Sequence, residues 1–237
     1  MNTLIHKSNT RGHADHGWLQ THYTFSFAGY YDPARVHFGT LRVLNDDVIA
    51  PGQGFGTHPH ENMEIITIPL SGMVAHKDSM GNEGQIREGE VQVMSAGTGI
   101  THSEFNGSND SELKLLQIWI FPREKGLQPR YGQLSVDDLR IKDQLFEVIS
   151  PSKNGSGLWL NSDSWFFMGE FENDRQITYD LKKSGNGVYL FVIEGSIFTG
   201  DHNLESRDGI GISGIDQISI EIRGGTRLLI MEIPMSI

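Results

Sequence analysis

Cysteine is absent from this sequence of 237 residues. The chain therefore has no disulfide, no thiolate-type zinc finger and no thiol nucleophile. Proline is scarce too, with 8 residues against 28 glycines, a balance that suits many short strands joined by tight turns. No apolar run approaches the roughly 20 residues that span a bilayer. The first residues also lack the apolar segment of a secretory signal. We therefore expect a cytoplasmic protein that does not bind membranes.

Basic residues are also too few to balance the acidic ones. The chain has 19 Lys and Arg against 30 Asp and Glu, which gives a formal net charge of -11. Such a surface repels the phosphates of nucleic acids and of anionic membranes, so direct nucleic-acid binding is not expected. The hydrophobic fraction of 37% is ordinary for a soluble globular protein. The length allows one large all-β domain or two small ones, each with a real core.

Strand-like segments recur along the chain, separated by turn sequences such as residues 45–47 and 71–72. Some of these segments, such as residues 115–120, are apolar on both faces, which fits a strand packed between two sheets. No long segment has the helical period of 3.6 residues. The sequence therefore predicts an all-β fold, with strands at residues 38–44, 63–70, 91–94, 113–121, 164–171, 176–181, 188–194, 217–222 and 227–233.

Residues 122–138 differ from their surroundings. This stretch is charged, contains Pro129 and lacks strand periodicity. Because linkers between domains are exposed and polar, we expect it to connect two domains.

Histidine is concentrated in the first half, and the spacing of three of these residues is informative. His58 and His60 stand two apart, so on a strand both side chains point to one face, about 7 Å apart along the chain. His102 and Glu104 repeat the spacing with a carboxylate. If the two segments are neighbouring strands, four ligands surround one point. Such a set suits iron, manganese, copper, nickel or zinc rather than calcium or magnesium, and leaves one or two positions for substrate and O2.

A single His-X-His pair also occurs on exposed loops without any metal. Two pairs, each in a glycine-rich turn-and-strand context, favour the metal site. His37 and His76 lie singly on predicted strands and are expected to be structural. In the second half His202 is the single histidine, too few imidazoles for such an ion, so we expect no metal there.

Two longer motifs resemble those of cupins. Residues 52–64 resemble the first cupin motif, with His58, His60 and a closing Glu64, and residues 89–106 resemble the second, with His102. More narrowly, residues 11–18, 24–27, 31–33 and 95–104 resemble the pirin family, in particular bacterial pirin-like proteins with quercetin 2,3-dioxygenase activity.

The resemblance implies two cupin barrels of the double-stranded β-helix or jelly-roll type. Residues 1–130 would form the metal-binding barrel and residues 131–237 a metal-free one. In ordinary cupins the carboxylate ligand is the glutamate of the first motif, here Glu64, whereas in pirins it is the one after the last histidine, here Glu104. The resemblance therefore implies one divalent ion, with iron favoured, on His58, His60, His102 and Glu104. By strand parity Glu64 would also face inward and orient a ligand or a water, the alternative being a surface carboxylate.

The activity that the resemblance implies is cleavage of a flavonol such as quercetin by O2, with Glu104 also serving as general base. The partners would then be a small aromatic substrate and O2. Cupins host several functions, so two alternatives stay open. One is a regulatory protein whose metal oxidation state alters a surface for protein partners, without turnover. The other is a metal-assisted isomerase or similar small-molecule enzyme on the same site.

Overall fold

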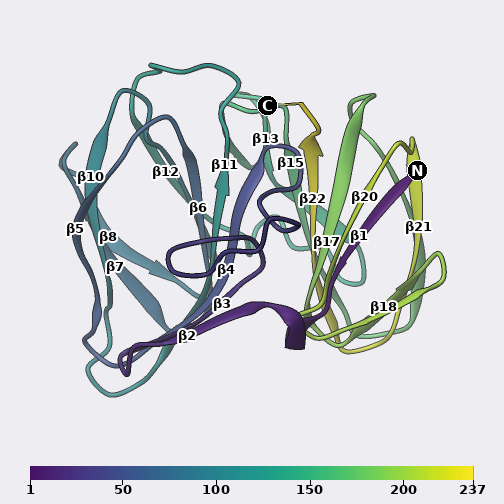
Figure 1. Cartoon of the computed structure of the whole chain (residues 1–237), viewed down its shortest axis with the longest axis horizontal. Helices are drawn as coiled ribbons and strands as arrows, with labels where there is room; N and C mark the ends of the chain where they lie inside the picture. Colours follow the sequence, from purple (N-terminus) through teal and green to yellow (C-terminus); the bar gives the residue numbers. More distant parts are fainter. Residues whose placement is uncertain (237) are drawn as a thin grey trace.

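A computed structural model describes residues 1–236 as two β-barrels that lie side by side (Figure 1). Within these residues the one helical segment is a single 3-10 turn at Ser8–Thr10. This confirms the predicted all-β class with two barrels. No helix in the described part of the chain is long and apolar enough to cross a membrane.

The first barrel consists of a seven-stranded sheet, in the order β12-β9-β6-β11-β4-β3-β2, facing a four-stranded sheet, in the order β5-β10-β7-β8. The strands are β2 (Gly12–Asp15), β3 (Leu19–Tyr23), β4 (Leu41–Ile49), β5 (Gly54–His60), β6 (Glu64–Ser71), β7 (Met73–Asp78), β8 (Glu83–Arg87), β9 (Glu90–Ser95), β10 (Ile100–Asn106), β11 (Leu113–Ile120) and β12 (Arg130–Ser135).

The second barrel repeats this plan, with a large sheet in the order β1-β20-β17-β22-β15-β13-β14 and a small one in the order β16-β21-β18-β19. Its strands are β1 (Asn2–His6), β13 (Leu145–Ser150), β14 (Leu158–Trp159), β15 (Trp165–Phe171), β16 (Arg175–Asp180), β17 (Asn186–Glu194), β18 (Ser196–Thr199), β19 (His202–Glu205), β20 (Gly209–Ser213), β21 (Gln217–Ile222) and β22 (Thr226–Pro234).

The largest hydrophobic cluster draws on the large sheets of both barrels. It joins Ile66 and Ile118 of the first barrel to Phe166, Tyr189 and Met231 of the second, and all five are buried. Strands of these sheets therefore bury both faces, one in their own barrel and one between the barrels. The apolar runs noted in the sequence are explained by this arrangement.

Two strands depart from the simple order of the chain. β1 pairs with β20, from Asn2 opposite Ser213 to His6 opposite Gly209, so the start of the chain completes the second barrel (Figure 1). β12 pairs with β9, with Arg130 opposite Ser95. Residues 122–138, which lack strand periodicity in the sequence, therefore contain a strand of the first barrel. The division into residues 1–130 and 131–237 stays a prediction.

The turn expected at residues 45–47 was also wrong, because β4 runs through them. Asp46 forms ion pairs with Arg11 at 3.1 Å and Arg207 at 3.7 Å, while Asp47 is buried opposite Thr21 of β3. These partners come from distant parts of the chain, so local turn chemistry alone did not reveal the strand.

Candidate metal centre

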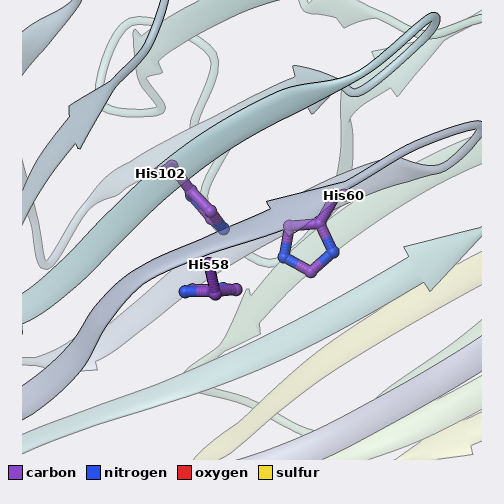
Figure 2. Close-up of side chains that lie close together, drawn as sticks. All are labelled: His58, His60 and His102. Carbon is purple, nitrogen blue, oxygen red and sulfur yellow. The ribbon is translucent and has the colours of Figure 1, made fainter.

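The three candidate histidines lie on two adjacent strands. His58 and His60 belong to β5, and His102 belongs to β10, where it stands directly opposite His58. One nitrogen from each of the three rings lies within 4.8 Å of the others. Figure 2 shows the three side chains grouped in this way. The condition set from the sequence, that the two motifs form neighbouring strands, is therefore met.

The surroundings leave ring nitrogens free for an ion. The Nδ1 atom of His58 lies 2.8 Å from the Gly56 carbonyl oxygen, which fixes the ring and leaves Nε2 available. Burial, reinforced by the neighbouring imidazoles, lowers the pKa of both His60 and His102 to about 3. Both rings are therefore neutral at physiological pH and keep a lone pair for coordination.

The residues present fit a bound metal ion. Both ring nitrogens of His102 are buried without a hydrogen-bond partner. Unpartnered buried nitrogens destabilise a fold unless a ligand or a water satisfies them. Three imidazoles within 4.8 Å of one another are the donors that borderline divalent transition metals prefer. An ion at this point would account for the grouping and would give one of the two His102 nitrogens a partner.

Glu104 follows His102 on β10, and its carboxylate is held by neighbouring side chains. It accepts hydrogen bonds from Thr67 Oγ1 at 3.2 Å and from Gln117 Nε2 at 3.0 Å. Burial raises its pKa, and the nearby imidazoles of His76 and His58 oppose that rise. The structure thus brings the three histidines together and anchors Glu104 on the same strand. The carboxylate is not part of the histidine group, so its role as a ligand stays a prediction.

Glu64 does not face the metal centre. The buried carboxylate accepts hydrogen bonds from Ser95 Oγ at 2.8 Å and from the backbone N–H and side-chain amide of Asn161 at 3.0 and 3.2 Å. Ile66 on the same face of β6 packs in the cluster between the barrels. Residues 61–63, with Asn62 at φ 49°, separate β5 from β6, so parity does not carry over from His60. The expected inward orientation of Glu64 was wrong.

His76, which was expected from the sequence to have only a structural role, lies beside the metal centre. It stands opposite Glu104 on β7, and its ring centroid lies 5.4 Å from that of His102. It is 2% exposed, stacks on Tyr131, and both of its nitrogens lack a partner. The signal that could have placed it inside the barrel is strand parity, because Val74 and Asp78 on the same face are also buried.

Polar and apolar layers surround the centre inside the barrel. Gln92, Thr67, Gln117 and Asn45 stand directly opposite one another across β9, β6, β11 and β4, and Glu104 bonds to two of them. A buried apolar cluster closes the interior beyond this row, made of Leu19, Ile49, Val74, Ile86, Leu113 and Leu115. A second cluster lies beside the histidines and includes Ile65, Met94, Ile100 and Trp119, whose ring contacts His60.

A cavity of about 510 Å³ opens beside His60. Its walls are formed by Pro59, His60, Glu61, Ser79, Gly99, Ile100 and Thr101. The volume is in the range of small-molecule sites. His60 is therefore accessible to a ligand of modest size from the ends of β5 and β10.

Two all-β barrels, with three grouped imidazoles in the first, define a bicupin with one candidate metal centre. The Pirin family model matches residues 5–120, and a model described as the quercetinase C-terminal cupin domain matches residues 147–233. The chain is 44% identical over 230 residues to the quercetin 2,3-dioxygenase of Escherichia coli K12, covering 97% of this chain and 98% of the relative. The chain belongs to the pirin family.

Two further comparisons agree. A pirin-like protein of Caulobacter vibrioides is 37% identical over 222 residues, covering 93% of this chain and 95% of the relative. The crystal structure of the bacterial pirin YhhW from Escherichia coli in complex with nickel(II) matches with a TM-score of 0.93 at 41% identity, covering 98% of this chain and 99% of that one. That relative binds a divalent metal, as the three-histidine site of this chain favours.

Proposed function

We propose that this protein is a metal-dependent dioxygenase that cleaves a flavonol such as quercetin with O2. The observation that carries the proposal is the group of three imidazoles on β5 and β10, of which His60 lines a cavity of about 510 Å³. The 44% identity to a quercetin 2,3-dioxygenase adds the reaction class.

In this proposal His58, His60, His102 and Glu104 hold one divalent ion. Iron is favoured, and manganese, nickel, copper and zinc also suit the donors. When bound, the ion supplies the Lewis acidity that favours ionisation of the flavonol 3-hydroxyl, and the resulting electron-rich enolate reacts with O2.

The side chains of the chain perform the other steps. Glu104 accepts the proton of the 3-hydroxyl, while Thr67 and Gln117 orient its carboxylate through the hydrogen bonds described above. The apolar side chains of Ile65, Ile100 and Trp119 seat the aromatic rings and exclude water from the reacting atoms.

The test is turnover by the metal-loaded protein. Supplied in air with iron, manganese, nickel or copper and with quercetin, it should bleach the flavonol absorbance and consume O2 in equal molar amount. Quercetin methylated at the 3-hydroxyl should not react, because it cannot form the enolate. His102→Ala is the matched control, since it removes a ligand and leaves the cavity wall intact.

A metal-loaded protein that binds quercetin and yet consumes no O2 with any of the four metals would contradict the proposal. That result would favour the regulatory alternative, in which the metal centre alters a surface for protein partners. Turnover without O2 uptake would instead favour an isomerase or related enzyme on the same site.

A further inference from the structure

A second cavity, of about 440 Å³, lies away from the three histidines. It is lined by Leu127, Gln128, Pro129, Arg130, Lys153, Trp159 and Asn161. Arg130 begins β12 of the first barrel, whereas Trp159 ends β14 of the second, so the cavity lies where the two barrels meet.

Two cations share the indole of Trp159 as a support. The guanidinium carbon of Arg130 lies 3.9 Å from the ring centroid and the Nζ atom of Lys153 lies 4.5 Å from it. Cation–π contacts of this length hold a cation without neutralising it. In the described part of the chain neither Arg130 nor Lys153 has a carboxylate within 4.0 Å, unlike the cations of the thirteen ion pairs.

One hydrogen-bond donor of Arg130 also lacks a partner. Its Nη2 atom contacts the Trp159 carbonyl oxygen and lies 3.4 Å from Ser95 Oγ, while its buried Nε–H has no partner. Glu64 is the carboxylate that acts on Arg130, but its oxygens are occupied by Ser95 and Asn161. Two cations and no carboxylate line the cavity, and with Glu64 counted beside Arg130 they leave one net positive charge, in a protein whose formal net charge is -11.

We propose that this cavity binds a small carboxylic acid with an apolar body. A single carboxylate would neutralise the excess charge and give Arg130 and Lys153 the charge-assisted hydrogen bonds that they lack. Leu127, Pro129 and the indole edge of Trp159 supply apolar contact for the rest of the molecule. The acidic surface elsewhere repels anions, so recognition depends on these two side chains.

The cavity also adjoins the segment that leads to the metal centre. The N–H of Thr98 donates to the carbonyl oxygen of Leu127 at 2.8 Å, and Arg130 stands opposite Ser95. A Cβ atom on Gly97 would lie 2.0 Å from that same Leu127 oxygen, so the two backbones are in close contact. Residues 127–130 are therefore in direct contact with residues 95–98, which lie shortly before His102 on the chain.

The experiment is titration calorimetry of the full-length, metal-loaded protein at constant ionic strength. The probe is benzoate, benzamide is its neutral counterpart, and inorganic phosphate tests for an anion without an apolar body. Benzoate should bind saturably and benzamide should not. Phosphate should bind more weakly than benzoate, because it makes no use of the apolar wall.

Variants place the site. Arg130→Gln and Lys153→Gln should each weaken benzoate binding about tenfold, as expected for loss of one charge-assisted hydrogen bond. Lys153 is exposed, so its replacement does not disturb the fold. Lys125→Gln is the matched control. Lys125 is exposed and lies in the same segment but outside the cavity, so its substitution removes one positive charge without removing a contact to the ligand. The affinity for benzoate should change less than about twofold.

Absence of saturable benzoate binding would overturn the proposal, and so would binding that Lys153→Gln leaves unchanged, since benzoate would then occupy another site such as the metal centre. Equal affinity for phosphate and benzoate would overturn the assignment to a carboxylic acid. None of these results depends on turnover of a flavonol.

Discussion

The side-chain amide of Gln117 donates a hydrogen bond to the carboxylate of Glu104 at 3.0 Å, which links β11 to β10 inside the first barrel. The same carboxylate accepts from Thr67 on β6 at 3.2 Å. The orientation of Glu104 is thus set by two strands of the opposite sheet, and a change in either strand should reach the metal centre.

The first prediction concerns Gln117. Gln117→Leu should weaken metal binding about 10–100-fold, the range for loss of a group that orients a ligand. A competition titration against a chromophoric chelator measures this affinity. Gln144→Leu is the control, because Gln144 is exposed in the second half of the chain, and it should leave the affinity unchanged. Equal affinities for wild type and Gln117→Leu would argue that Glu104 does not hold the ion.

The second prediction separates the two glutamates. Glu104→Gln should abolish or greatly weaken metal binding, because a neutral amide replaces an anionic ligand. Glu64→Gln should keep the metal and lower the stability by about 2 kcal/mol, because it loses charge-assisted hydrogen bonds with Ser95 and Asn161 between the barrels. Metal analysis and urea unfolding read the two effects separately. A reversed outcome would return the site to the ordinary cupin pattern.

These two glutamates also show what the sequence could and could not predict. The all-β class follows from the recurring strand-like segments. The grouping of His58, His60 and His102 follows from spacing two along a strand, on the condition that β5 and β10 are neighbours, which the structure meets. The orientation of Glu64 does not, because residues 61–63 break the alternation between β5 and β6. The alternation of side chains between the two faces holds within one strand. It does not carry across a loop with irregular backbone to the next strand.

The prediction of a turn at residues 45–47, within β4, was wrong for a related reason. Asn45, Asp46 and Asp47 have the composition of a turn, yet they lie within a nine-residue strand. Asp46 is paired with Arg11 and Arg207, and Asn45 stands opposite Gln117. Contacts with distant residues outweighed the turn preference of Asn and Asp. A single sequence does not show which distant residues make these contacts.

The third prediction concerns acid stability and His6. Burial is the main cause that lowers its pKa from 6.5 to about 4. Between these values the unfolded chain takes up a proton that folded His6 does not, so stability present above pH 6.5 is lost as the pH falls toward 4. His6 should account for about 2 kcal/mol of the loss between pH 7 and 4.5.

Urea unfolding of wild type and His6→Gln at several pH values measures this. The variant loses the contact between His6 Nδ1 and the Tyr189 hydroxyl at 2.7 Å, so it should be less stable at pH 7. The free energy of unfolding of the variant should fall less steeply as the pH is lowered. The curves of this free energy against pH for the variant and the wild type should therefore converge. The metal-site histidines are present in both proteins and cancel in the difference. Parallel curves would show that His6 is not responsible.

The fourth prediction concerns Glu232 in the second barrel. This fully buried carboxylate accepts hydrogen bonds from Tyr179 Oη at 2.7 Å, from the backbone N–H groups of Lys182 and Lys183 at 2.7 and 2.9 Å, and from Asn186 Nδ2 at 2.9 Å. Glu232→Gln turns an amide donor toward these donors and should lower stability by about 3 kcal/mol or more. Thermal unfolding measures the loss, and Glu221→Gln, at an exposed position of β21, is the control.

The pairing of β1 with β20 has a consequence for synthesis on the ribosome. Asn2 lies opposite Ser213, so β1 has no partner until 211 further residues have been added. At the usual 5–20 residues per second this takes about 10–40 s. The strands of the first barrel are all complete by Ser135, so it can close while β1 still trails free as an unpaired edge. The nascent chain thus carries β1 as an unpaired strand until β20 is made, and the pairing of these two strands is a late event of folding.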